Sequence, residues 1–377
     1  MTNHNDLVVI AGRAGKQFAQ KVIKEFSKLK DCPVPDLTLG EVDIIDFPNG
    51  ELSARLNVNL RKKAVHVFQS IILGKNRNIF KDFFEVFVIN DALKRAGAQS
   101  IINYWSFLPF QRQDKKTRGR EPISAKLIFD LLATSGGKYF NRIVTAEMHT
   151  DAAQGFADVP VDNVRALPLF LLYYKNHATL KNVNINELVV VSPDTGGAAR
   201  ARFFAERLGT NCAIIEKRRF YDETGKTESL QLIGNVRNKY AIMIDDIIDT
   251  GSSVLNGAEL LWEEGAKKVF ACCTHGLFSA DKKGIPAEKK FYDANIEVLT
   301  TDTIPRGQSY HDTSYKWLRT VSLARYFADA LYSNHTGQSF SECLQNHLNE
   351  AMANQVNIED YLIPIKPKEL WEIDDDK

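Results

Sequence analysis

The stretch Ala241–Ser253, AIMIDDIIDTGSS, decides the fold of this chain. It begins with four apolar residues, Ala241–Ile244, which is the short, bounded run expected of a strand buried on both faces of a sheet. Two adjacent carboxylates follow, and then a turn of small residues. Apolar residues at helical spacing come next, and Gly265 supplies a stop signal. The stretch therefore predicts a strand, a loop and a helix, as in an α/β protein.

The loop between this strand and helix has the composition of a site for a sugar phosphate. Backbone N–H groups at a helix N-terminus bind phosphate, and hydroxyl side chains add further donors. The two carboxylates repel an anion and suit the hydroxyl groups of a ribose instead. An ordinary helix-capping turn is the alternative, but a buried pair of carboxylates is costly without a ligand. The predicted sugar-phosphate residues are Asp245, Asp246, Asp249, Thr250, Gly251, Ser252 and Ser253.

Length and charge bound the possible functions. The 377 residues are enough for two domains, and 48 basic side chains nearly balance 47 acidic ones. Neither a nucleic-acid surface nor a membrane surface is expected from this balance. We see no signal peptide and no membrane span. The five cysteines show no CxxC spacing, so we expect reduced thiols in a cytoplasmic protein.

Two segments of the first half carry candidate ligand groups. The loop Gln111–Pro122 is dense in basic side chains and lies between a predicted strand and a predicted helix, where ligands of α/β sheets bind. It is either a solvated loop or a site for polyphosphate. His149 ends the predicted strand Arg142–Thr150, as either a structural histidine or a ligand group.

Two segments of the second half repeat this pattern. In Leu188–Phe204, an apolar strand precedes Asp194, two glycines and a helix. Asp194 is a candidate metal ligand or hydroxyl acceptor, with helix capping as the alternative. The charged segment Lys217–Asn235 is poor in apolar periodicity. It is either a disordered surface loop or a mobile lid that places Lys217 and Arg219 over a phosphate.

Several motifs together resemble the phosphoribosyl pyrophosphate (PRPP) synthetase family. The stretch 241–253 alone fits either this family or a phosphoribosyltransferase, and the other motifs distinguish the two. These motifs are DFPNGE (46–51), FLPFQRQDKK (107–116), TAEMH (145–149), QGFADVPVDN (154–163), VSPDTGG (191–197) and THGLFS (274–279). The resemblance runs from about residue 7 to about residue 344, and simple phosphoribosyltransferases lack most of the first half.

The resemblance implies a reaction and residue roles. The β,γ-pyrophosphoryl group of ATP would pass to the C1 hydroxyl of ribose 5-phosphate, with Mg²⁺ as cofactor. His149 and Asp194 would serve in catalysis and as metal ligands, and Lys217 and Arg219 would act from the catalytic flexible loop. The residues expected to bind ATP are Phe47, Asn49, Glu51, Arg112, Gln113 and Asp114.

The resemblance also implies the architecture. We expect two tandem phosphoribosyltransferase-like domains, each a mostly parallel sheet flanked by helices. Residues 1–163 would form the ATP-side domain, completed by about 320–344, and residues 164–319 the ribose-phosphate domain. Residues 345–377 would be an extension without an assigned role. The turn 46–51 would reach the ATP site of a neighbouring subunit, which implies a dimer-based homo-oligomer such as a hexamer.

Departures from the family pattern leave alternatives open. Glu147-Met148 stands where the family usually has Asp-Leu, and Ser252 occupies a position usually held by Gly. Asp151 stands where phosphate-regulated members tend to have Ser, so we predict weak phosphate activation and weak ADP inhibition at that position. The alternatives are a larger acceptor such as ADP-ribose, or a non-catalytic homologue that assembles with a true synthetase.

Overall fold

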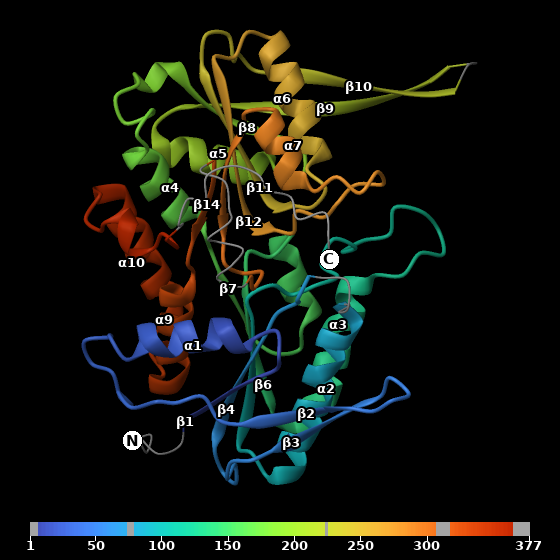
Figure 1. Cartoon of the computed structure of the whole chain (residues 1–377), viewed down its shortest axis with the longest axis vertical. Helices are drawn as coiled ribbons and strands as arrows, with labels where there is room; N and C mark the ends of the chain where they lie inside the picture. Colours follow the sequence, from blue (N-terminus) through green and yellow to red (C-terminus); the bar gives the residue numbers. More distant parts are fainter. Residues whose placement is uncertain (1–6, 74–78, 223–224, 307–316, 365–377) are drawn as a thin grey trace, which may run out of the picture.

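The computed structural model describes residues 7–73, 79–222, 225–306 and 317–364, and side chains at 218–228 are outside this description. Two mostly parallel sheets with flanking helices make up the fold, which confirms the predicted α/β class. The N-terminal sheet lies in the lower half of Figure 1 and the C-terminal sheet in the upper half. The acidic tail of the sequence lies outside the described residues.

The N-terminal half is built around a five-stranded parallel sheet of order β1-β4-β5-β6-β7. An antiparallel ribbon, β2–β3, stands beside this sheet. The elements are β1 (Leu7–Ala11), α1 (Lys16–Phe26), β2 (Val42–Asp46), β3 (Leu52–Leu56), β4 (Ala64–Gln69), α2 (Ile79–Ala96), β5 (Ser100–Trp105), α3 (Ser124–Gly136), β6 (Phe140–Ala146) and β7 (Val161–Val164).

The C-terminal half is built around a seven-stranded sheet of order β10-β9-β8-β11-β12-β13-β14, in which only the β9–β10 pair is antiparallel. The elements are α4 (Leu167–Asn176), β8 (Leu188–Ser192), α5 (Ala198–Leu208), β9 (Asn211–Asp222), β10 (Gly225–Ile233), β11 (Tyr240–Ile248), α6 (Ser252–Glu263), β12 (Lys268–Gly276), α7 (Ala287–Asp293), β13 (Glu297–Thr301), β14 (Leu318–Val321), α9 (Ala324–Thr336) and α10 (Phe340–Ala353).

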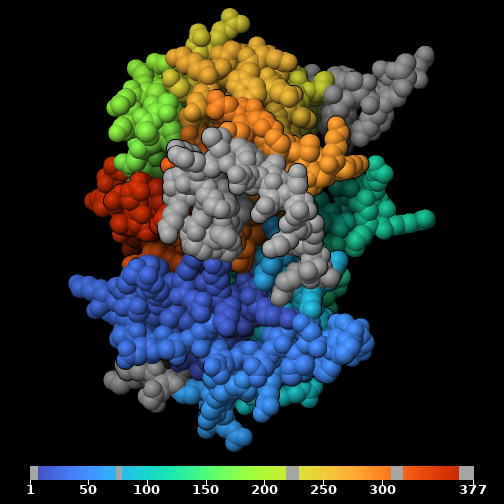
Figure 2. All heavy atoms as spheres, viewed as in Figure 1, coloured from blue at the N-terminus to red at the C-terminus, as the bar shows by residue number. Residues whose placement is uncertain are grey.

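The last helices connect the two halves. The aromatic rings of Phe18 on α1 and Phe327 on α9 meet edge to face, with centroids 5.0 Å apart. Buried residues of α1, α4, α5 and α9 belong to one hydrophobic core that both sheets share. In Figure 2 the red atoms of the C-terminal helices accordingly lie between the blue N-terminal half and the green start of the C-terminal half. The predicted domain boundaries remain a prediction.

Two sequence expectations are corrected. The strand predicted at Ala241–Ile244 runs on to Ile248, because Asp245 and Ile247 still pair with β12. The segment Lys217–Asn235, expected to be a loop or lid, is instead largely the hairpin β9–β10, which projects at the top of Figure 1. Ile215, Leu230 and Leu232 lie at the base of this hairpin and pack on the C-terminal core, and β9 also pairs with β8.

Candidate active site

The candidate site lies at the carboxyl end of β11, between β8 and β12 in the C-terminal sheet. The loop 249–251 leaves this strand, and α6 begins at Ser252. Gly251 is the N-cap residue of α6, with φ of 76°, and a Cβ atom there would lie 2.7 Å from the Phe291 ring. Both the backbone angle and the lack of space require glycine. The first N–H groups of α6 are thereby presented to the site.

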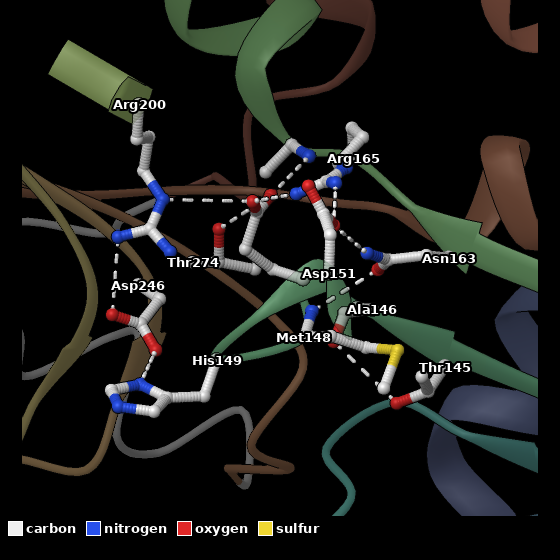
Figure 3. Close-up of polar contacts among 12 residues, drawn as sticks. Thr145, Ala146, Met148, His149, Asp151, Asn163, Arg165, Arg200, Asp246 and Thr274 are labelled. Carbon is white, nitrogen blue, oxygen red and sulfur yellow. Dashed lines mark hydrogen bonds and ion pairs between the residues drawn. The ribbon is translucent and has the colours of Figure 1, made fainter. Parts of the chain in front are cut away.

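Asp246 on β11 lies where a histidine of the N-terminal half and an arginine of the C-terminal half meet (Figure 3), and Asp245 precedes it on the same strand. Asp246 Oδ2 is 2.7 Å from His149 Nδ1, and Asp246 Oδ1 accepts a hydrogen bond from Arg200 Nη1 at 3.1 Å. Asp245 Oδ1 lies 3.6 Å from the same Arg200 nitrogen. Arg200 also approaches the buried Glu147, at 3.7 Å. The single positive charge of Arg200 therefore lies beside three carboxylates, those of Asp245, Asp246 and Glu147.

The electrostatics separate the two carboxylates. Burial together with the neighbouring Asp246 raises the pKa of Asp245 well above its usual value. Burial acts on Asp246 too, but the His149 hydrogen bond and the Arg200 charge outweigh it and lower the pKa of Asp246. The hydrogen bond from Asp246 in turn raises the pKa of His149. Asp246 is therefore the stronger acid of the two, and its hydrogen bond favours the protonated form of His149.

The backbone before His149 is held from three directions. Glu147 has φ of 32°, an uncommon value for a residue with a side chain. Its carbonyl lies 3.2 Å from His275 Nε2, and the following N–H donates to Asn163 Oδ1 at 3.1 Å. The N–H of His149 donates to Gln111 Oε1 at 3.3 Å. These contacts fix the direction from which the imidazole enters the site.

Cationic side chains surround the loop 249–253. Lys217 Nζ donates to Ser253 Oγ at 3.3 Å, and Lys290 Nζ donates to the carbonyl of Thr250 at 2.7 Å. Arg112 comes from the N-terminal half and lies 3.3 Å from Asp249. Thus Lys217 lies at the predicted phosphate loop, whereas the side chain of Arg219 lies outside the described residues.

The residues expected to bind ATP fall into two groups. Arg112 points to the phosphate loop, and the charge of Asp114 contributes to the raised pKa of His149. The carboxamide oxygen of Gln113 instead accepts a hydrogen bond from Ser124 Oγ at 2.7 Å, at the start of α3. Phe47, Asn49 and Glu51 form the exposed turn of the β2–β3 hairpin. Their hydrogen bonds, Phe47 N to Glu51 O and Glu51 N to Asn49 Oδ1, stay within that turn.

The expected metal ligands offer a partial set. Asp194 Oδ1 accepts a hydrogen bond from the N–H of Gly197, which is the N-cap residue of α5, so Asp194 stabilises the loop before the helix and does not cap the helix itself. Among the described residues, no group of three or more His, Cys, Asp or Glu side chains could hold a metal ion. Mg²⁺ commonly binds through one or two carboxylates, with water and substrate phosphates as its other ligands. The donors of Asp194 and His149 therefore fit a divalent cation whose other ligands are water and nucleotide phosphates.

A cavity of about 660 Å³ opens on the other side of the Arg200–Glu147 pair. Arg165 on its wall binds the carboxylates of both Glu147, at 2.9 Å, and Asp151. The opposite wall belongs to α10 and includes Leu344 and Leu348. Asp151 is therefore already paired with a cation of its own chain.

Comparisons with known proteins identify the family. The ribose-phosphate pyrophosphokinase of Fusobacterium nucleatum is 37% identical over 91% of this chain and 99% of its own length. That of Thermotoga maritima is also 37% identical, over 88% of this chain and 96% of its own. This chain belongs to the ribose-phosphate pyrophosphokinase family.

Two family models and a solved structure extend the assignment. A model of the N-terminal domain of ribose phosphate pyrophosphokinase matches residues 7–136, and a model of the phosphoribosyl synthetase-associated domain matches residues 219–345. The crystal structure of phosphoribosylpyrophosphate synthetase from Mycobacterium smegmatis superposes with a TM-score of 0.75. It is 34% identical and covers 88% of this chain and 100% of its own.

Sequence reasoning missed three residues that this member of the pyrophosphokinase family brings to the site. Arg200 lies in the first turn of α5, just after the predicted Asp194 loop. The strand–loop–helix pattern could therefore have predicted its position near the acidic pair. Lys290 and Gln111 reach the site only through tertiary contacts.

Five cysteines are free in the structure, as expected. Within the described part of the chain, no helix has the length and apolar character needed to span a membrane.

Proposed function

We propose that this chain transfers the β,γ-pyrophosphoryl group of ATP to the C1 hydroxyl of ribose 5-phosphate, giving PRPP and AMP. Family membership supports the reaction. The observation that carries it for this chain is the contact between His149 of one half and Asp246 of the other, beside a phosphate-type loop. His149, which is proposed to act at the nucleotide, and Asp246, which is proposed to bind the sugar, are thus in direct contact.

The loop 249–253 supplies the sugar-phosphate site in this proposal. The N–H groups at the start of α6 and the hydroxyls of Thr250, Ser252 and Ser253 would bind the 5-phosphate. Lys290, held 2.7 Å from the Thr250 carbonyl, keeps a positive charge behind the loop. Asp245 and Asp246 would accept hydrogen bonds from the ribose diol, which orients C1 toward the nucleotide.

Charge neutralisation and alignment would then drive the transfer. The anomeric oxygen bonds to the β-phosphorus, the bond from that phosphorus to the α-phosphate oxygen breaks, AMP leaves and a proton is released. Lys217, Arg219 and Arg112 would place positive charge on the phosphates. Bound Mg²⁺ would add charge neutralisation, with Asp194 and His149 as the proposed protein groups nearest to it.

The ATP side is proposed to be shared between subunits. Phe47, Asn49 and Glu51 make their hydrogen bonds within their own exposed turn, so they are available to a neighbour. A dimer-based homo-oligomer such as a hexamer would bring this turn to the nucleotide held by Arg112, Gln113 and Asp114. Binding by Gln113 would then use its amide group, since its oxygen is engaged with Ser124. The proposed location is the cytoplasm, where the free cysteines stay reduced.

The two alternatives gain no support from the site. Ser252 Oγ lies 3.2 Å from Thr250 Oγ1, so its side chain turns along the loop rather than toward a differently shaped acceptor. His149, Lys217 and the acidic pair all occupy positions that a catalytic member needs. Ribose 5-phosphate is therefore the proposed acceptor.

The test is AMP release from Mg-ATP, with ribose 5-phosphate and ADP-ribose offered separately. Rapid AMP formation with ribose 5-phosphate, accompanied by PRPP, is the expected result. Activity with ADP-ribose alone would establish the larger acceptor. No turnover with either compound would refute catalysis and favour the regulatory role.

A further inference from the structure

The turn 47–51 is tied to the N-terminal sheet through the residue that precedes it. Asp46 ends β2, and both of its carboxylate oxygens accept hydrogen bonds from Arg13, from Nη1 at 2.6 Å and from Nη2 at 3.0 Å. This is the two-pronged geometry that makes arginine–carboxylate pairs directional. Asp46 is 41% exposed, yet its position is defined by a planar group on another element.

Arg13 is itself held from behind. Its backbone N–H donates to Glu85 Oε2 at 3.0 Å and its Nε to Glu85 Oε1 at 2.6 Å. The side chain of Glu85, on α2, is completely buried. Gln69 at the end of β4 lies 3.3 Å from the same carboxylate. The guanidinium therefore connects a buried acid to an exposed one.

The loop that carries Arg13 has little room to move. A Cβ atom on Gly15 would lie 2.2 Å from the Phe68 carbonyl oxygen, and one on Gly12 would lie 2.5 Å from the Gln69 side chain. The N–H of Gly12 also donates to the Phe68 carbonyl, at 3.0 Å. The glycines let the loop press directly on β4, so Arg13 projects from a rigid base.

A second cation completes the contact. Lys81, at the start of α2, lies 3.0 Å from Asp46 Oδ1. Hydrogen bonds from Arg13 and then Lys81 lower the pKa of Asp46. Asp46 is thereby joined to the β1–α1 loop through Arg13 and to α2 through Lys81.

We propose that Arg13 and Asp46 are positioning residues that hold the turn 47–51 in the orientation in which it meets a nucleotide. The proposal rests on the proposed function, because that function gives the turn its ligand. The turn itself is exposed and is stabilised by few contacts, so without Asp46 it would sample other orientations. Ordering it on binding would then cost affinity for ATP.

The turn is expected to act on the nucleotide base, away from the reacting phosphates, so the two kinetic constants should respond differently. Loss of the contact should raise KM for ATP about tenfold, equivalent to about 1.4 kcal/mol. It should leave kcat and KM for ribose 5-phosphate within about twofold. A merely structural role would instead change the amount of active protein and leave KM for ATP unaltered.

The test compares Asp46→Asn with Asp43→Asn in the full chain. Asp43 lies on the same strand and is also exposed, but its carboxylate accepts from Asn57 at 2.8 Å within the hairpin. Asp46→Glu serves as the conservative variant. Arg13→Ala is less informative, because it would strip a buried carboxylate of its partner and destabilise the fold. Steady-state kinetics and hydrogen exchange of the amides in 42–56 are the two readouts.

The expected result is faster exchange of the hairpin and a higher KM for ATP in Asp46→Asn, near-normal values in Asp43→Asn, and partial recovery in Asp46→Glu. The proposal is overturned if Asp46→Asn and Asp43→Asn agree in both readouts while the unaltered chain makes PRPP. If the unaltered chain makes no PRPP, the proposed function fails. The exchange difference between the two variants would still support or refute the anchoring role.

Discussion

His149 Nδ1 and Asp246 Oδ2 lie 2.7 Å apart, although they belong to different sheets and are 97 residues apart in the chain. The contact joins the end of the N-terminal strand β6 to the end of β11. Because each partner shifts the pKa of the other toward the charged form, the pair should be visible in the titration of His149 and in the pH dependence of stability.

We predict that Asp246→Asn lowers the pKa of His149. The contact raises the pKa of His149 above about 6.5, its ordinary value, so the positive charge persists to higher pH in the unaltered protein. Asp114 adds to this effect and Arg200 opposes it. Titration of His149 by NMR should show this downward shift in the variant. An unchanged His149 titration would contradict this account.

The stability of the unaltered protein should follow the same pair. The raised pKa of His149 stabilises the fold fully below about pH 6.5, and this contribution is lost as the pH rises through the folded-state value. The lowered pKa of Asp246 stabilises the fold above about pH 3.9, and this contribution is lost at lower pH. The difference in unfolding free energy between the unaltered protein and Asp246→Asn should therefore be largest between about pH 4 and 6.5. Denaturant unfolding across this range measures it.

Lys217→Ala should lower kcat about a hundredfold and change KM for either substrate by less than about threefold. Lys217 lies 3.3 Å from Ser253 at the phosphate loop, and its charge matters most when charge moves between phosphates. Lys282→Ala, in an exposed loop, is the matched control. A rise in KM with normal kcat would make Lys217 a binding residue instead.

Arg200→Ala should destabilise the protein by about 3–5 kcal/mol, because Glu147 and Asp246 are buried and would lose a shared cation. Lysine at this position keeps the charge but cannot reach all the carboxylates at once. The stability of Arg200→Lys should therefore lie between those of the unaltered protein and Arg200→Ala. Chemical denaturation with an unaltered m value checks both variants. Equal stability of all three proteins would show that the carboxylates do not depend on this charge.

Gly251→Ala should lower stability by about 1–3 kcal/mol and raise KM for ribose 5-phosphate, because φ of 76° and the 2.7 Å approach to Phe291 both oppose a methyl group. Gly284→Ala tests backbone angle alone, since its φ of 79° comes with open space around Cβ. The two variants should therefore differ in thermal unfolding and in sugar-phosphate affinity. Similar losses in both would assign the effect to φ only.

Asp151→Ser should strengthen activation by inorganic phosphate. Asp151 pairs with Arg165, which also pairs with Glu147. The Asp151 carboxylate therefore neutralises a positive charge that would otherwise be open to a phosphate ion. Initial rates over a phosphate series, with ADP inhibition measured beside them, check this expectation. Strong phosphate activation in the unaltered chain would remove the argument.

The sequence predicted best what depends on short stretches. The core of β11, the loop 249–251 and the start of α6 follow from an apolar run, small residues and helical spacing, whereas the end of β11 was expected at Ile244 and lies at Ile248. What it missed depends on distant contacts. The ribbon β9–β10 shows little apolar periodicity because its apolar contacts with the core lie at its base. Arg200 meets the acidic pair only once α5 is packed beside β11. The site of Gln113 likewise required the start of α3.

The packing of α9 on α1 has a consequence for synthesis of the chain. Phe18, Val22 and Phe26 on α1 belong to the same core as Phe327 and Leu331 on α9, near the other end of the sequence. Protein chains leave the ribosome N-terminus first. The apolar face of α1 therefore stays uncovered by α9 until most of the protein has been made. Within the N-terminal half, α1 is therefore expected to reach its native packing last, and its apolar face to be the part most in need of a chaperone during translation.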